Sequence, residues 1–139
     1  MKAIGAILCF IVLCSYSCEK PPFVDKFYRI IVINNSPNSI RVLLSDEYAT
    51  NQYPDTNLAM SKPSLQKIAT GNSGYFDSKT PWEENFNKLP ADTLSVIFID
   101  NDIYENEPWD SVRAHYNILK RVDLSIIDLK ALNYKIIYP

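Results

Sequence analysis

Apolar, β-branched and aromatic residues recur along the chain in short runs that are separated by polar turns. The clearest runs are FYRIIVIN (27–34), IRVLLSD (40–46) and TLSVIFID (93–100), and each has the length and composition of a β-strand. The same character, in shorter form, is found at 65–69, 74–78, 116–123 and 134–139. The pattern therefore predicts six or seven short strands.

The polar segments between these runs predict turns and short helices. The cluster NSPNS at 35–39 predicts an antiparallel hairpin between the first two strands. Residues 81–86 and 107–115 have helical character, and Ser125 with Asp128 forms a capping-box pattern that opens a third helix. No crossover helix of ten or more residues follows the strands, so a parallel α/β fold is not expected.

These elements together predict a mainly β protein. The expected fold is a single antiparallel β-sandwich, immunoglobulin-like or transthyretin-like, with two or three short helical inserts.

The first seventeen residues have the pattern of a secretory leader. Lys2 is followed by the uncharged run AIGAILCFIVL at 3–13, which is well short of the ~20 apolar residues that a membrane span needs. A buried N-terminal helix is the alternative, but such a helix seldom lacks polar residues around its whole circumference.

The leader ends in SYS before Cys18, which resembles the lipobox of bacterial lipoproteins. That resemblance implies cleavage before Cys18 and acylation of its thiol and its new amino group. The expected organisation is a signal peptide (1–17), a lipidated tether (18–26) and a β-sandwich domain (27–139).

Composition excludes several kinds of chemistry. All three cysteines lie at or before position 18, so the domain has no thiol for catalysis, zinc binding or a redox motif. Only Gly71 and Gly74 follow the leader, too few for a phosphate-cradling loop. The net charge of −2, with no basic face, gives no reason to expect nucleic acid as a partner, and no cofactor is expected.

One dense acidic stretch, DNDIYENEPWD at 100–110, is a candidate for chemistry. Asp100 and Asp102 alternate as calcium ligands do, but Glu105 stands where an EF-hand loop has its sharp-turn glycine. We interpret the stretch as a solvated loop after a strand, with Asp100 and Asp102 as weak cation candidates. A carboxylate-dependent hydrolase remains an alternative, because paired carboxylates can cleave glycosides.

Aromatic residues in or near the predicted connections are the main binding candidates. Tyr53, Tyr104 and Trp109 could stack on sugars or anchor a partner, although the more common role of such residues is packing. Tyr53 and Tyr104 are preferred, because Trp109 also has a packing partner in Val112, at i+3 on the predicted helix. The only histidine, His115, is expected at a helix end and not in a catalytic site.

Several segments are similar to a known group of proteins. The segments DTLSVIFID, YNILKRVDLS and the terminal LNYKIIYP resemble small uncharacterised lipoproteins of Bacteroides-type bacteria, which tend to carry a DTL strand, ILKRYDLS and a terminal LNWTITYP. The resemblance implies a lipid-anchored, mostly β domain, and no functional residue is carried over from it. Thr93 and Ser111 also match a short O-glycosylation pattern, Asp followed by Ser or Thr and an apolar residue.

The sequence thus predicts a lipid-anchored protein of the cell envelope, at the outer membrane. The expected role is a non-enzymatic interaction or accessory module, with the membrane as one partner and an unknown protein or glycan as another. A carbohydrate-binding module and, less expected, a hydrolase are the alternatives.

Overall fold

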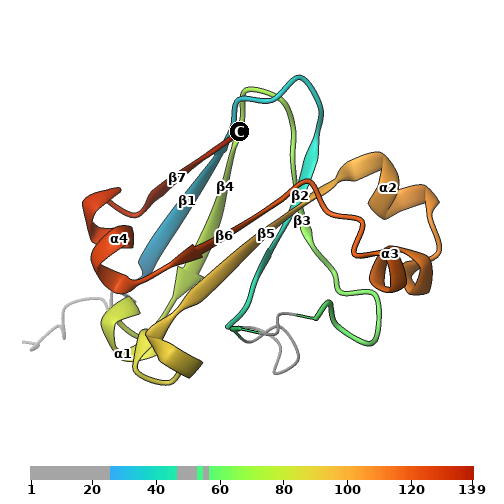
Figure 1. Cartoon of the computed structure of the whole chain (residues 1–139). Coiled ribbons are helices and arrows are strands. Elements are labelled where there is room, and N and C mark those ends of the chain that lie inside the picture. The colour runs from blue at the N-terminus through green and yellow to red at the C-terminus, as the bar shows by residue number, and fades with distance from the viewer. Residues whose placement is uncertain (1–25, 47–52, 55–56) are drawn as a thin grey trace, which may run out of the picture.

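The computed structural model describes residues 26–46, 53–54 and 57–139, in which seven strands form two sheets (Figure 1). The strands are β1 (Tyr28–Asn34), β2 (Ile40–Leu44), β3 (Gln66–Ile68), β4 (Ser73–Ser78), β5 (Leu94–Asp100), β6 (Lys120–Leu124) and β7 (Lys135–Tyr138). The helices are α1 (Trp82–Phe86), α2 (Asn101–Asn106), α3 (Trp109–His115) and α4 (Ile126–Ala131), with a 3₁₀ turn at Pro90–Asp92. Within these residues the two sheets do not close into a barrel, and the prediction of a mainly β protein is confirmed.

Sheet A has the order β4-β1-β7, and sheet B has the order β3-β2-β5-β6. All pairs are antiparallel except β1 with β7, which is parallel, so the prediction of a purely antiparallel fold is wrong there. The reason is the route of the chain, because helix α4 carries it from β6 in sheet B to β7 in sheet A. That crossover lets β7 run in the same direction as β1.

The predicted hairpin between the first two strands is also wrong, because β1 and β2 lie in different sheets. The intervening turn is an arch that crosses from one sheet to the other. Asn34, fully buried at the end of β1, donates from Nδ2 to the carbonyl oxygens of Asn38 (2.8 Å) and Ile68 (3.0 Å). Its Oδ1 accepts from the backbone N–H (3.0 Å) and hydroxyl (2.6 Å) of Ser36.

A second arch, at 69–72, joins β3 in sheet B to β4 in sheet A and lies beside the first. The backbone of Asn34 accepts from the Gly71 N–H (2.7 Å) and donates to the Asn72 carbonyl (2.9 Å). Gly71 has a φ of +73°, a conformation that costs glycine little and other residues more. The strands expected at 65–69 and 74–78 are confirmed as β3 and β4, and the turn between them is an arch that joins the two sheets.

Side chains from both sheets form one core between them. It includes Ile30 and Val32 of β1, Val42 of β2, Phe98 of β5 and Ile136 of β7. Tyr138 stacks on Phe98 across the sheets, with ring centroids 4.7 Å apart.

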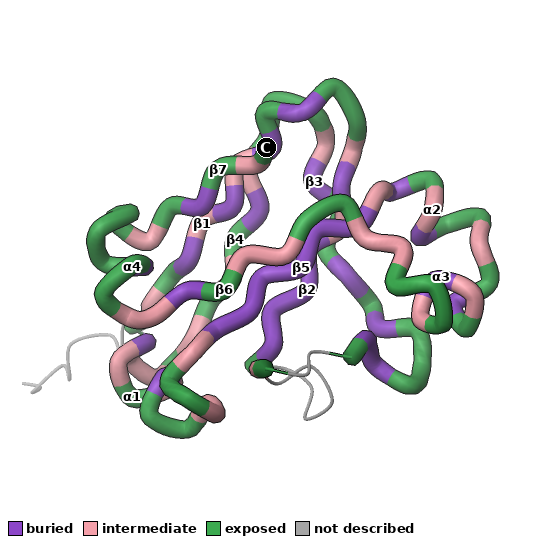
Figure 2. Tube along the Cα trace, viewed as in Figure 1, coloured by how far each residue is buried: buried purple, intermediate pink, exposed green. Residues whose placement is uncertain are grey.

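A second core covers the opposite face of sheet B, so the domain has three layers. Leu43 and Ile97 of this face pack against Tyr104 of α2, Val112 of α3 and the segment 57–65. Strand β5 is consequently buried on both faces, as its continuous purple trace shows (Figure 2). This double burial explains why its sequence is an unbroken apolar run.

The predicted helices are confirmed as α1, α3 and α4. In α4 the Ser125 hydroxyl accepts from the Asp128 N–H, and the Asp128 carboxylate accepts from the Ser125 N–H at 2.9 Å. These two bonds make the capping box that the sequence indicated. Among the helices that the structure describes, none is long and apolar enough to cross a bilayer.

The last strand offers a direct test of the inner core, because its two isoleucines face opposite ways. Ile136 is 4 % exposed and Ile137 is 57 % exposed. We expect Ile136→Ala to lower the free energy of unfolding by about 2–5 kcal/mol, the usual cost of an emptied core site. Ile137→Ala is the matched control and should stay within about 0.5 kcal/mol. Urea unfolding measures both values, and equal losses would contradict the assigned facing of β7.

Candidate functional site

The acidic stretch at 100–110 is not the solvated loop that the sequence suggested. Residues 101–106 form helix α2, and Asp100 is its N-cap. The Asp100 carboxylate accepts from the backbone N–H groups of Asp102 (2.7 Å) and Ile103 (3.4 Å). A carboxylate at a helix N-terminus satisfies donors that the helix itself leaves unpaired, which accounts for this acid without a metal.

Other acids of the stretch are also engaged with neighbouring residues. Glu105 pairs with Arg41, whose guanidinium also donates to the Leu65 carbonyl (2.6 Å). Glu107 accepts from the Asn117 amide (3.2 Å). Within the described part of the chain, no group of three or more His, Cys, Asp or Glu side chains is placed to hold a metal ion, so Asp100 and Asp102 gain no further ligand there.

Two of the three aromatic candidates are packing residues. Tyr104 and Trp109 are each 8 % exposed and meet edge to face, with ring centroids 6.3 Å apart. The Tyr104 hydroxyl donates to the Pro63 carbonyl, and the Trp109 indole N–H donates to the Ala59 carbonyl (2.8 Å). Both side chains thus hold the segment 57–65 against sheet B, so the alternative packing role fits them and a surface anchor does not.

The third aromatic candidate, Tyr53, is half-buried, and its ring lies 5.8 Å from the Arg121 guanidinium. No contact joins it to Tyr104 or Trp109 among the described residues, so the structure does not gather the three into one site. The predicted lipidation residue, Cys18, lies outside the described residues.

The remaining candidates take local roles. His115 Nδ1 lies 3.0 Å from the Ser111 carbonyl in its own helix, at the helix end where the sequence placed it. The Thr93 hydroxyl donates to the Ala91 carbonyl (2.8 Å). Glycosylation of Thr93 and Ser111 stays a prediction.

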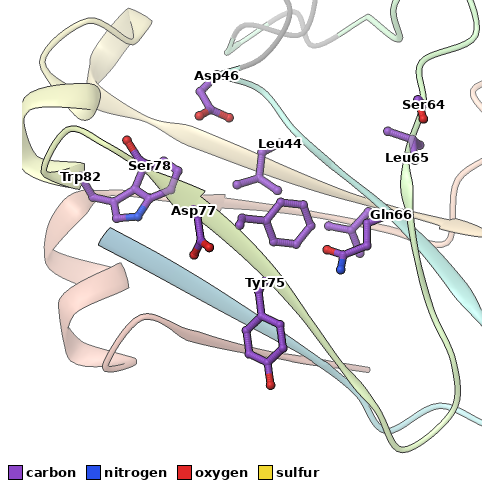
Figure 3. Close-up of a pocket in the computed structure, with 11 residues that line it drawn as sticks. Leu44, Asp46, Ser64, Leu65, Gln66, Tyr75, Asp77, Ser78 and Trp82 are labelled. Atoms are coloured by element: carbon purple, nitrogen blue, oxygen red, sulfur yellow. The ribbon is translucent and has the colours of Figure 1, made fainter. Parts of the chain in front are cut away.

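A cleft of about 460 Å³ lies between the edge strands β3 and β4, and no sequence pattern predicted it (Figure 3). Its floor includes Val42, Leu44 and Trp82, which are almost fully buried. Ser64 and Gln66 line its wall on the β3 side and are exposed. The volume is within the ~300–1,000 Å³ typical of ligand pockets.

The cleft exists because the two sheets meet at the arches and separate away from them (Figure 1). At the arch end Gly74 packs directly on Ile68, so closely that a Cβ on Gly74 would lie 2.4 Å from the Ile68 Cδ1. A side chain at position 74 would force the Ile68 side chain out of its present position. The need for glycine here is a close approach of two strands, not a phosphate loop.

Two carboxylates line the cleft, those of Asp46 and Asp77, and among the described residues only Asp77 pairs with a cation. Asp77 accepts two bonds from the Arg29 guanidinium, at 2.6 and 2.7 Å, and this partner holds the pKa of the Asp77 carboxyl below its usual value. Desolvation raises the pKa of the Asp46 carboxyl, although the residue as a whole keeps exposed surface. No cation pairs with Asp46 in the described part of the chain.

Ser64 and Gln66 make no side-chain hydrogen bond to the residues described here. A hydroxyl, a primary amide and a carboxylate therefore face an open cleft whose floor is apolar. This arrangement can hold a ligand that offers both hydrogen-bonding groups and an apolar surface.

No family model, no curated protein and no solved structure matches this chain.

The packing role of Tyr104 predicts a specific loss of stability. Tyr104→Phe leaves the buried Pro63 carbonyl without its donor, and we expect a loss of about 1–3 kcal/mol. Tyr75→Phe is the control, because Tyr75 is 52 % exposed and should lose almost nothing. Thermal and urea unfolding of both variants measure the difference. Equal stability of the two variants would show that the Tyr104 hydroxyl does not hold the segment 57–65.

Proposed function

We propose that this chain is a lipid-anchored, non-enzymatic binding module of the cell envelope, at the outer membrane. The leader that ends at Cys18 supports the anchor, and the first strand begins ten residues after that cysteine. The protein would then be tethered to a membrane without spanning it, since acyl chains contribute about 0.8 kcal/mol for each buried CH₂.

We propose further that sheets A and B pack as a β-sandwich of the immunoglobulin-like or transthyretin-like kind. The shared core of Ile30, Val42 and Phe98 supports this arrangement, because aligned sheets bury their facing side chains in one layer. The parallel strand β7 makes sheet A mixed, so the resemblance would be one of architecture and not of strand order.

The observation that carries the binding role is the cleft between β3 and β4. Ser64 and Gln66 lie there without side-chain partners in the described structure, whereas Asp100, Glu105 and Glu107 are engaged by neighbours. The dense acidic stretch therefore serves the packing of α2 and α3, and the open polar groups are in the cleft. A protein partner is the leading ligand.

A glycan is the alternative ligand, and the open hydroxyl of Ser64 and amide of Gln66 favour it. Such groups hydrogen-bond to the hydroxyls of sugars, while an apolar floor can contact the faces of sugar rings.

The anchor is tested by metabolic labelling with a fatty acid in living cells. We expect Cys18→Ala to abolish the label, because the acylated thiol is gone, and Cys14→Ala to retain it as the matched control. Label on the Cys18→Ala protein would disprove the assignment of the lipobox.

The cleft is tested by a photo-crosslinking amino acid placed at Gln66, with Asn106 on exposed α2 as the control position. We expect a discrete product in intact cells at 66 and none at 106. A glycan array on the same protein separates the two ligands, since sugar binding that is lost in Gln66→Ala would favour the glycan. Products of equal yield at both positions, with no sugar bound, would contradict a binding role for the cleft.

A further inference from the structure

The two sheets differ in what covers their outer faces. Helices α2 and α3 and the segment 57–65 cover the outer face of sheet B. No described element covers the outer face of sheet A, which lies on the opposite side of the domain (Figure 1). We call this surface the outer face of sheet A and define it by Arg29, Ile31, Ile33, Tyr75, Asp77, Lys135 and Ile137.

Strand register places these residues on one surface. Ile31 of β1 lies between Tyr75 of β4 and Lys135 of β7, and Ile33 lies beside Ile137. Along β1 the buried residues alternate with partly exposed ones, as its alternating purple and pink segments show (Figure 2). Side chains on a strand point alternately to opposite faces, so Ile31 and Ile33 point away from the inner core.

This face is more apolar than an exposed sheet face needs to be. Ile31 and Ile33 belong to neither core, and Ile137 and Tyr75 are more than half exposed. A strand with one solvated face usually alternates apolar and polar residues, but β1 has isoleucine on both faces. Four apolar or aromatic side chains clustered on one surface indicate a contact with another protein or with a membrane.

The area of the face argues against a second copy as the occupant. Three strands about 4.8 Å apart, of 7, 6 and 4 residues at ~3.4 Å per residue, present a flat area of about 300 Å². A stable protein interface buries about 800 Å² on each partner. The face is therefore suited to a weak contact that another attachment strengthens.

The tether supplies such an attachment, if Cys18 is lipidated as proposed above. Ten residue steps separate Cys18 from Tyr28, so the start of β1 lies within about 35 Å of the anchored cysteine. A short link of this kind turns a weak second contact into an intramolecular one with a high effective concentration.

The chemistry of the face suits the headgroup layer of a bilayer. Isoleucines can enter the acyl boundary, and tyrosine, an amphipathic ring, is favoured at that depth. The Arg29 guanidinium lies 4.8 Å from the centroid of the Tyr75 ring. Lys135 adds a second cation to the same face, on the other side of Ile31. The acid on this face, Asp77, is already paired with Arg29, which leaves Lys135 available for lipid phosphates.

We infer that the outer face of sheet A lies on the membrane that carries the lipid anchor. This inference rests on the proposed anchor. It orients the domain with α2 and α3 away from the bilayer and with the β3–β4 cleft open to the side.

The chain is suited to a direct test, because no cysteine follows Cys18. A nitroxide label is attached to Ile137→Cys or Tyr75→Cys in the full lipidated protein, with Asn106→Cys on α2 as the control. Each protein is reconstituted into vesicles of phosphatidylethanolamine and phosphatidylglycerol, and power-saturation EPR measures collisions with oxygen and with a water-soluble nickel chelate. Circular dichroism confirms the fold of each variant.

We expect the labels at 137 and 75 to lose nickel collisions and gain oxygen collisions relative to 106. Lys135→Glu should restore part of the nickel access at 137, because it opposes the lipid phosphates. Nickel access at 137 and 75 equal to that at 106, in protein that floats with the vesicles, would overturn the orientation while the anchor stands. Spin–spin broadening between copies at 137 would overturn it in favour of a second copy. Wild-type protein that does not float would refute the anchor itself, and this inference with it.

Discussion

The hydrogen bonds of the buried Asn34 side chain stabilise the point where the chain crosses between the two sheets. Its amide donates to the carbonyl of Asn38 in the first arch and to that of Ile68, the last residue of β3 before the second arch. Its backbone carbonyl accepts from the Gly71 N–H, and its backbone N–H donates to the Asn72 carbonyl, both in the second arch. Because a buried amide is costly when unpaired, these bonds favour the one arrangement in which β1 and β2 separate into different sheets.

The remaining architecture follows from that crossing. Gly74 lets β3 and β4 touch beside the arches, and the sheets then part, which opens the cleft toward Trp82. Sheet B is covered by α2, α3 and the segment 57–65, so its central strand is buried on both faces. Sheet A is covered on one face only in the described structure. A single crossing thus gives the domain a cleft at one edge and an exposed apolar face on one side.

Local sequence patterns were sufficient to predict most strands and helices, but not which strands pair with one another. The strand at 93–100 and the capping box of Ser125 could be predicted, since each depends on residues close in the chain. From sequence alone, residues 35–39 are typical of a hairpin turn. They form an arch instead, and the Asn34 amide that stabilises it donates to Ile68, which lies far along the chain. The cleft is missed for the same reason, since its walls come from strands that local sequence does not pair.

The stability of Asn34→Ala shows most directly whether this side chain joins the two sheets, and Asn35→Ala, its exposed neighbour, is the control. We expect Asn34→Ala to lower the free energy of unfolding by about 2–4 kcal/mol in urea, because several buried hydrogen-bonding groups lose their partner at once. Asn35→Ala should change stability by less than about 0.5 kcal/mol. If Asn34→Ala is as stable as the wild type, the arches are held by something other than this side chain, and the account of how the sheets are joined is wrong.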